Sequence, residues 1–522
     1  MTKPSASWPQ RNACPNLVRD PWIPVCDLNG KRSIVSLRAL FHKAADLAEI
    51  ATGHAPTDAA LTIFTSAVVG AAAIADNDRE QIDILKAARF PDNLDAYLSI
   101  WEPKFDIASE DGGFMQVPPS QVEKIKRTVP GKTLFPDSNA NDDFKMYRRP
   151  TRTEVTWDQA VRALIERQLF DLGGPVSSPI VVPGNSGSHG VGGVAATSMI
   201  VYAVGRSLLE TLLLNAPTRK DGDAPTWEET PTVGLTKERR KGVLRSMTAR
   251  SRTALFEYNN RGNVANLVFG PGQSYEPEYV LENAAFVLAY KNNKDQVRYP
   301  KVDVGRGAWN ACYMAFMVTE KSSARITFFG NLRMFPGKIR ASIPIRFVGY
   351  AADKKLVKYA RCEEYSIPRS LFEDPIGSKV TLLDAAEYAK TAIDCAINVI
   401  KDASRNMPTE LKAKKSSEDF RARCYDVVSR NYQTLINNIA GVAGEARENA
   451  LRKWSFHIIN LVKIEMTRDL ASLDDARKYA ESVAKYSKFS INIKLLTAEQ
   501  KTRIEDAKNK ARPSKDQEAG KS

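Results

Sequence analysis

The spacing of hydrophobic positions predicts short strands and a buried helix near the N-terminus. Around the turn signal Asn29-Gly30, β-type runs at residues 22–26 and 33–37 predict a hairpin. The small apolar run at residues 59–75 is interrupted by Thr, Ser and Gly and flanked by Asp. It is too polar for a membrane span and predicts a buried core helix.

A glycine-rich region follows a helix predicted at residues 157–172. Residues 173–175, Gly-Gly-Pro, end that helix, and residues 183–193 contain too many glycines to pack a core. Glycine lets a backbone approach another backbone or a phosphate closely, because it has no Cβ. The spacing matches neither a dinucleotide-binding turn nor a P-loop, which disfavours ATP hydrolysis. The residue pattern over 266–290 and 326–350 predicts mainly strands with loops.

The C-terminal part of the chain changes to long amphipathic helices. Thr381 and Asp384 resemble a capping box at the start of the first helix, and further helices are expected over residues 420–439, 446–461 and 473–486. In the first helix, apolar residues recur at spacings of three and four: Leu382, Ala386, Ala389, Ile393, Ile397 and Ile400. Four helices with one apolar face each and short connections predict an antiparallel four-helix bundle.

The predicted fold class is therefore α+β, with a mixed α/β N-terminal globular domain followed by the C-terminal antiparallel four-helix bundle. The chain has 522 residues, about twice the size at which a single hydrophobic core usually stops growing. We expect the N-terminal domain over residues 1–375 and the bundle over residues 380–490. Residues 491–522 should form a final helix and a polar, partly disordered tail.

Charge and cysteine usage narrow the cellular setting. The 75 Lys and Arg residues outnumber 61 Asp and Glu residues, and the formal charge of +14 favours association with a polyanion without identifying it. The six cysteines form no Cys-x-x-Cys and fit neither a zinc site nor a secreted disulfide framework. The N-terminus lacks a secretory signal. We expect reduced thiols, a cytoplasmic location and no membrane association.

A loop predicted between residues 130 and 150 ends in a basic cluster. It has no hydrophobic period and is rich in Pro, Asp, Asn and Ser. Its distal part places cations beside an aromatic ring: Lys145, Tyr147, Arg148, Arg149 and Arg152. Such a cluster suits phosphate binding and base stacking, and a solvated basic loop is an equally good interpretation.

The sequence contains few of the residue patterns that catalytic sites usually need. The chain has four histidines, none followed by Asp and none in an H-x-H, H-E-x-x-H or H-N-H arrangement: His42, His54, His189 and His457. A nuclease that binds metal through histidine is therefore hard to build. His457 beside an apolar stripe suits a structural role, and His189 suits a solvent-facing turn. We expect no catalytic residue, no metal and no cofactor, and favour a non-enzymatic binding role.

Several short segments, in order along nearly the whole chain, resemble one known family. Residues 16–25 resemble the opening strand motif of the CasA family, the large subunit of the type I-E CRISPR Cascade complex. Residues 113–116 are similar to its F-M-Q segment, and residues 205–215 to its G-R-x-L-x-E-T-L-L-L-N helix. Residues 225–227 and 358–368 also fit. Together, these motifs are far more specific than any one of them.

The resemblance implies a subunit without catalysis of its own. In the family, this subunit checks the short motif beside the target (the PAM), helps to separate the duplex so that guide RNA can pair, and recruits a helicase-nuclease. Base pairing then carries most of the sequence recognition. Minor-groove edges distinguish chiefly A·T from G·C pairs, so tolerance of several PAMs is expected. The implied partners are the other Cascade subunits, crRNA, double-stranded target DNA and the helicase-nuclease.

The resemblance also assigns site residues. The glycine loop that the family lays against the PAM backbone matches Gly173, Gly174, Pro175 and Ser177. A wedge hairpin that opens the duplex matches the loop at residues 349–358, with these candidates: Gly349, Asp353, Lys354, Lys355 and Lys358. Lys354 stands where a relative carries glutamine. A minor-groove lysine corresponds to Lys291 or Lys294, and the basic cluster at residues 145–152 occupies the place of a loop facing the complex and the crRNA 5′ end.

Two other classes of function remain open at this point. One is a scaffold that coats nucleic acid regardless of sequence, whose affinity would depend on salt and strand length. The other is a metal-dependent nuclease with an unrecognised site, which would cleave DNA with Mg²⁺ or Mn²⁺.

Overall fold

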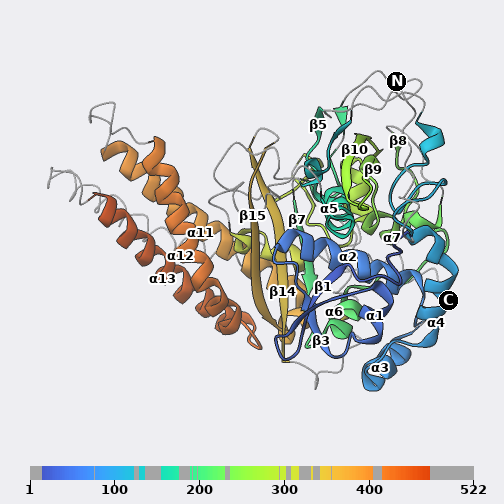
Figure 1. Cartoon of the computed structure of the whole chain (residues 1–522). Coiled ribbons are helices and arrows are strands. Elements are labelled where there is room, and N and C mark those ends of the chain that lie inside the picture. The colour runs from blue at the N-terminus through green and yellow to red at the C-terminus, as the bar shows by residue number, and fades with distance from the viewer. Residues whose placement is uncertain are drawn as a thin grey trace, which may run out of the picture. The chain divides into compact units, whose positions relative to one another are not determined.

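The computed structural model describes these residues: 14–75, 77–122, 128–135, 155–175, 189–190, 192–196, 198–229, 236–292, 294–300, 307–316, 331–332, 341–353, 356–403 and 414–470. They fall into two compact units (Figure 1). Helices and strands are mixed in the described chain, as the α+β prediction expects, and unit 2 consists mainly of helices. Unit 1 contains the described residues up to 302 and those within 323–339 and 344–364. Unit 2 contains those within 303–322, 340–343 and 365–470.

The helices of unit 1 are mostly short. In chain order they are α1 (Leu37–His42), α2 (Ala55–Ala71), α3 (Asp78–Ala87), α4 (Asp92–Trp101), α5 (Trp157–Phe170), α6 (Leu208–Asn215), α7 (Val243–Met247) and α8 (Pro277–Asn283). The helices predicted at residues 59–75 and 157–172 are confirmed as α2 and α5. Helix α2 is buried along almost its whole length, and it packs against α5 and α6.

Strands form small sheets around these helices. Three of the sheets have three strands: β2 (Arg32–Val35), β1 (Ile23–Asp27) and β3 (Leu47–Ile50); β4 (Val129–Pro130), β10 (Val264–Pro271) and β9 (Arg252–Tyr258); β15 (Leu356–Pro368), β14 (Ser342–Asp353) and β7 (Met199–Ala203). The two-stranded pairs are β5 (Gly174–Pro175) with β6 (His189–Gly190), β8 (Thr236–Lys237) with β11 (Gln273–Ser274), and β12 (Tyr290–Lys291) with β13 (Val297–Arg298). Strands therefore dominate the second half of unit 1, although residues 277–283 of the region predicted as mainly strands are helical.

The predicted N-terminal hairpin is confirmed as the pair β1–β2, with Ile23 opposite Val35. Its turn depends on Gly30, whose φ of +83° is a conformation that side chains disfavour. Asp27 Oδ1 accepts the backbone N–H groups of Asn29 and Lys31 at 2.9 and 2.8 Å, which closes the turn.

The core of unit 1 centres on Phe64 of α2. Its ring lies 6.2 Å from Trp22, 5.5 Å from Phe114 and 5.6 Å from Trp227 between centroids, all at edge-to-face angles. Phe105 stacks on Phe114 at 5.4 Å. All five rings are buried. A cluster of this size supplies much of the hydrophobic stabilisation of unit 1.

Unit 2 is dominated by three long helices that follow α10 (Arg369–Glu373): α11 (Pro375–Ala403), α12 (Lys414–Asn438) and α13 (Gly444–Leu470). They lie side by side in Figure 1 and pack against one another. Trp309, from an earlier stretch of the chain, is fully buried and stacks on Tyr425 of α12 at 5.4 Å. The fourth predicted helix, at residues 473–486, lies outside the described residues, as does the tail at 491–522.

The predicted start of α11 is wrong. The helix begins at Pro375, and Asp374 Oδ1 accepts the backbone N–H of Gly377 at 3.1 Å, as an N-terminal cap does. Thr381 lies inside the helix, where its Oγ1 donates to the carbonyl of Gly377 at 2.8 Å. The Thr381/Asp384 spacing therefore resembles a capping box without being one.

No helix in the described part of the chain combines the length and the apolar character needed to cross a bilayer.

Candidate nucleic-acid interface

The glycine loop, defined here as residues 173–175, follows α5, and its last two residues form strand β5. Helix α5 ends at Phe170, as the sequence predicts. Gly174 pairs with Gly190, and Pro175 pairs with His189, in the antiparallel pair β5–β6. Ser177 lies outside the described residues. The glycine loop is therefore continuous with a β-ribbon.

A buried charge cluster, the Asp171 triad, fixes the start of this loop. Arg167 Nε and Arg252 Nε approach Oδ2 of Asp171 at 3.0 and 2.5 Å. The side chains of Arg252 and Asp171 are only 3% and 8% exposed, which strengthens the charge interaction. Arg252 Nη2 also donates to the carbonyl of Leu172 at 2.8 Å. The two residues before Gly173 are thereby tied to the first residue of β9.

Two further residues, Gly193 and Gln168, also hold the segment between α5 and the glycine loop in position. The backbone N–H of Gly193 donates to the carbonyl of Asp171 at 2.8 Å. A Cβ on Gly193 would lie 2.3 Å from the carbonyl oxygen of Leu169, so only glycine fits there. The Gln168 side chain bonds both backbone groups of Arg252, at 2.8 and 3.0 Å, and so imitates a neighbouring strand. The glycine-rich segment thus uses a missing side chain for backbone approach, as expected, at Gly193.

The segment matched to the wedge hairpin, residues 349–358, covers the end of β14 and the start of β15. Gly349 is buried inside β14, where it pairs with Met199 of β7, so its assignment to a loop is wrong. The strand continues past Gly349 to Asp353, and Tyr350 in this stretch packs in the core, where its hydroxyl donates to the buried carboxylate of Glu166. Lys358 lies within β15, whereas Lys354 and Lys355 lie outside the described residues.

Arg346 braces the base of this hairpin. Its Nε donates to Glu364 of β15, and its Nη1 donates to Glu49 of β3, both at 2.7 Å. The guanidinium plane of arginine suits such a double contact. The base of the hairpin is therefore joined to a second sheet of unit 1.

The two minor-groove lysine candidates occupy one small hairpin, β12–β13. Lys291 is in β12, and its Nζ lies 3.1 Å from Oδ1 of Asp295. Lys294 is in the turn and is exposed, and its backbone N–H donates to Asn292 Oδ1 at 3.0 Å. Both lysines are exposed, and Lys291 is the one that pairs with a carboxylate in this hairpin. The basic cluster at Lys145, Tyr147, Arg148, Arg149 and Arg152 lies outside the described residues.

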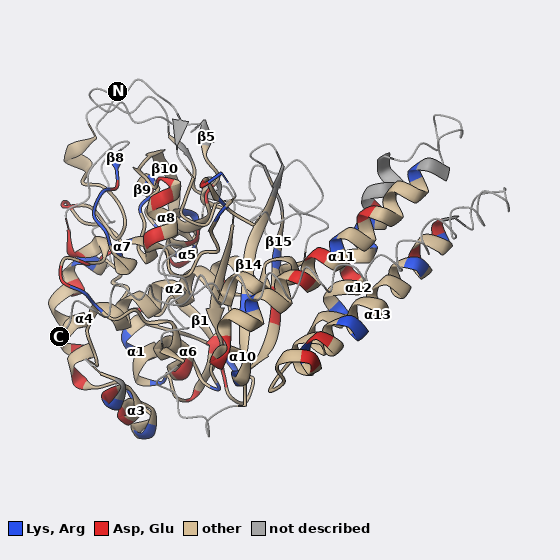
Figure 2. Ribbon diagram, turned by 180° about the vertical axis from the view of Figure 1, so that it is seen from behind, with Lys and Arg blue, Asp and Glu red and all other residues tan. Residues whose placement is uncertain are grey.

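Cations on the helices of unit 2 are interspersed with acidic residues (Figure 2). Arg423 of α12 pairs with Glu465 of α13 at 3.1 Å and also contacts Asp469. Arg421 pairs with Asp394 of α11 at 3.2 Å. These arginines form ion pairs between helices of unit 2. In this structure they therefore join neighbouring helices and are not held in reserve for an external anion.

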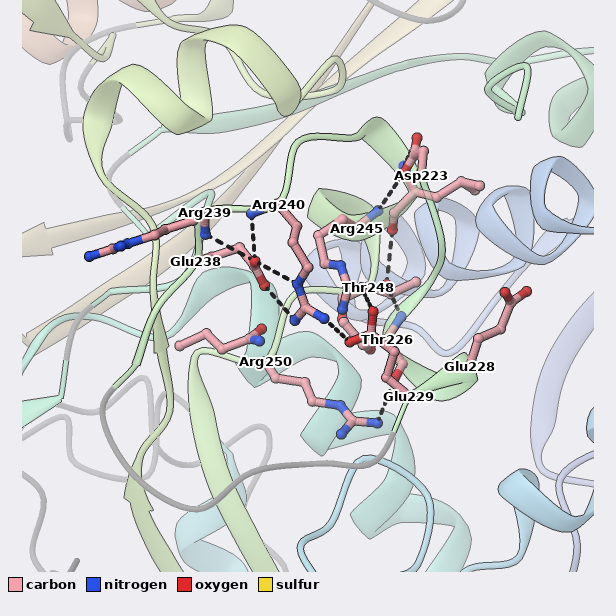
Figure 3. Close-up of polar contacts among 12 residues, drawn as sticks. Asp223, Thr226, Glu228, Glu229, Glu238, Arg239, Arg240, Arg245, Thr248 and Arg250 are labelled. Atoms are coloured by element: carbon pink, nitrogen blue, oxygen red, sulfur yellow. Dashed lines mark hydrogen bonds and ion pairs between the residues drawn. The ribbon is translucent and has the colours of Figure 1, made fainter. Parts of the chain in front are cut away.

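A pocket lined by arginines was not predicted from the sequence. Figure 3 shows the surrounding residues: Arg240 lies between Glu238 and Glu229, and the Arg250 guanidinium approaches the backbone of Thr226. The pocket has a volume of about 100 Å³. The lining residues are Met115, Val117, Thr226, Glu229, Arg240, Arg245, Arg250, Arg252, Thr253, Gly272 and Gln273. The sequence signal that points to it is the density of Lys and Arg over residues 237–252.

The residues that the structure describes contain no group of three or more His, Cys, Asp or Glu side chains arranged to hold a metal ion. His457 is exposed, and its Nε2 lies 3.3 Å from Asn431 Oδ1.

Comparison with known families and structures identifies the chain. The family model of the CRISPR-associated protein Cse1 matches residues 16–462. The protein belongs to the Cse1 family. No curated protein matches it in sequence. The fold resembles that of Thermus thermophilus CasA (Cse1), with a TM-score of 0.74 at 18% identity, covering 91% of this chain and 98% of that one.

Two further solved structures share the Cse1 fold. Cse1 from Acidimicrobium ferrooxidans superposes with a TM-score of 0.70 at 19% identity, covering 97% of this chain and all of that one. A chain described as a CRISPR RNA-guided surveillance complex gives a TM-score of 0.71 at 17% identity, with 92% of this chain and 100% of that chain covered. The predicted family is therefore confirmed.

The motifs that carry the family resemblance lie in the core of this Cse1 protein. Trp22, Phe114 and Trp227 surround Phe64, as described above. The Gln116 side chain donates to the carbonyl of Ile107 at 2.6 Å and accepts the backbone N–H of Phe256 at 2.8 Å. These motif residues are buried and contribute to the packing of unit 1.

Proposed function

We propose that this Cse1 protein is the non-catalytic large subunit of a cytoplasmic, CRISPR RNA-guided DNA surveillance complex. It recognises the PAM through the minor groove with the glycine loop, opens the duplex with the wedge hairpin, and recruits the helicase-nuclease. Its partners are the other Cascade subunits, crRNA and target DNA. Family membership supports the proposal, and so does the shared fold with a chain described as a CRISPR RNA-guided surveillance complex.

The observation that carries the proposal is that β14 continues beyond its pairing with β7. The pairing of β14 with β7 runs from Ile345 to Gly349, and β14 continues to Asp353 without β7. An extended tip supported at its base suits insertion into a duplex. New contacts must offset the cost of unstacking, roughly a few kcal/mol per base step. Between the two strands in sequence, Lys354 and Lys355 supply cations for pairing with displaced phosphates.

The glycine loop complements the wedge because its anchor is rigid. The Asp171 triad and the backbone bond from Gly193 hold the segment that precedes Gly173. Residues without side chains can approach a sugar-phosphate backbone closely. Lys294 and the basic cluster at residues 145–152 would add sequence-independent phosphate contacts, to DNA and toward the crRNA respectively.

The test compares reconstituted complexes that carry wild-type protein or Lys354→Ala/Lys355→Ala. We expect the variant to assemble normally, to bind PAM-containing duplex more weakly, and to bind a pre-opened target almost as well as wild type. A variant with two exposed lysines removed elsewhere, Lys86→Ala/Lys104→Ala, controls for net charge. Equal duplex binding and equal strand opening in all three complexes would refute the wedge assignment.

The same assay separates the alternatives. Binding that is indifferent to the PAM and set only by salt and strand length would favour a nucleic-acid scaffold. Cleavage of DNA by the isolated chain with Mg²⁺ or Mn²⁺ would contradict a non-catalytic role.

A further inference from the structure

The arginine pocket of unit 1 has an unusual balance of charge. Four of its lining residues are arginines and one is glutamate. Two of the arginines, Arg245 and Arg252, have side chains only 3% exposed. Positive charges that are close together and shielded from solvent repel one another, and this costs free energy unless anions compensate them.

Most of these cations are compensated by carboxylates of the protein. Glu229 contacts both Arg240 and Arg245. Arg240 Nε also lies 3.2 Å from Glu238 Oε1. Arg252 belongs to the Asp171 triad. For these three arginines, protein carboxylates account for the charge.

Arg250 is the exception. Its Nη2 donates to the carbonyl of Thr226 at 3.0 Å, and its Nε is shielded from solvent with no hydrogen-bond partner in the described part of the chain. Burial lowers the pKa of Arg250 to about 10, so the guanidinium is still charged at neutral pH. The residue as a whole is partly exposed to solvent, and a guanidinium bonded to one neutral carbonyl keeps N–H donors for an external anion.

We propose that the arginine pocket is an anion site in which Arg250, assisted by Arg245, binds a phosphate group of a nucleic-acid strand. The volume of about 100 Å³ corresponds to about three water molecules. A space of this size accommodates a single tetrahedral oxyanion. Guanidinium groups bind such oxygens through paired, charge-assisted hydrogen bonds.

The position of the pocket favours a nucleic-acid phosphate over a free one. Arg252 lines the pocket, and its Nη2 also holds the carbonyl of Leu172, immediately before the glycine loop. A strand phosphate in the pocket would thus share one arginine with the anchor of that loop. The nature of the ligand rests on the proposed function, whereas the existence of an anion site does not.

The first experiment measures the thermal unfolding of the isolated full-length chain in inorganic phosphate and in sodium chloride of equal ionic strength. Phosphate should raise the melting temperature further than chloride, because a ligand that binds only the folded state stabilises it. No difference between the salts would overturn the anion site, and would leave the PAM test on assembled complexes unaffected.

Arg250→Met identifies the residue responsible. It keeps the bulk of the side chain and removes a poorly compensated charge, so we expect an unchanged or higher melting temperature without phosphate. We expect phosphate affinity to fall about ten- to a hundredfold, the equivalent of one charge-assisted hydrogen bond. A full phosphate response in this variant would overturn the assignment. Arg298→Met, an exposed arginine in β13 outside the pocket, is the matched control and should respond like wild type.

Glu229→Gln should change affinity in the opposite direction. It removes the carboxylate shared by Arg240 and Arg245, so phosphate should bind severalfold more tightly even if the fold is less stable. Weaker binding in this variant would contradict the proposal. A short single-stranded oligonucleotide should compete with inorganic phosphate in wild type and not in Arg250→Met. If inorganic phosphate binds and the oligonucleotide does not compete, the nucleic-acid assignment fails while the anion site stands.

Discussion

Removing the carboxylate of the Asp171 triad tests the anchor of the glycine loop. Asp171→Ala leaves two buried guanidinium groups without their shared anion, and breaking a buried pair in this way costs about 3–5 kcal/mol. Arg252 keeps carbonyl acceptors on Ser251 and Leu172 at 3.1 and 2.8 Å. Arg167 keeps a cation–π contact with Phe269 at 4.5 Å. These remaining contacts place the expected loss in the free energy of unfolding near the lower limit, about 3 kcal/mol.

The matched control is Asp158→Ala on the same helix. Asp158 also pairs with an arginine four residues away, Arg162, at 2.8 Å, but its side chain is 23% exposed. Its loss should be about 1 kcal/mol. Urea unfolding followed by circular dichroism measures both values, and hydrogen exchange of α5 and β9 assigns the change to unit 1. Equal losses in the two variants would refute the idea that the triad anchors this region.

Two further substitutions test packing at single positions. Gly193→Ala should cost about 1–3 kcal/mol because the new Cβ would meet the Leu169 carbonyl, and an unchanged melting temperature would contradict this. Trp309→Ala should cost about 3–5 kcal/mol in unit 2, because the buried ring stacks on Tyr425. Trp309→Phe should lose less in the same urea titration. Equal losses in the two Trp309 variants would contradict this, because they would show that a phenyl ring at this position recovers none of the lost stability.

Local patterns predicted the elements whose determinants lie close together in the chain. The β1–β2 hairpin follows from Asn29-Gly30 and its flanking apolar residues. Helix α2 follows from a run of small apolar residues, and the end of α5 follows from Gly-Gly-Pro directly after it. The start of α11 was missed because the Thr381/Asp384 spacing outweighed Asp374 and Pro375, which provide the actual cap and first turn.

The candidate site was harder to predict, because its determinants are distant in sequence or contradict the hydrophobic pattern. The triad joins Asp171 to Arg252 across 81 positions, and charged residues are not expected in a core. Gly349 looked like a loop residue because the sequence does not show that β14 extends past it to Asp353. The family motifs predicted the fold well because residues such as Trp22 and Trp227 are core residues. For the same reason they say little about which residues contact DNA.

Unit 2 is assembled from separated stretches of the chain, and this limits how the protein can be dissected. Trp309 belongs to the stretch at residues 303–322, whereas its stacking partner Tyr425 lies more than a hundred positions later. An expression fragment that starts near residue 365 would lack this tryptophan and leave an apolar hollow beside α12. A usable fragment of the helical unit would need residues 303–322 grafted onto it through an artificial linker.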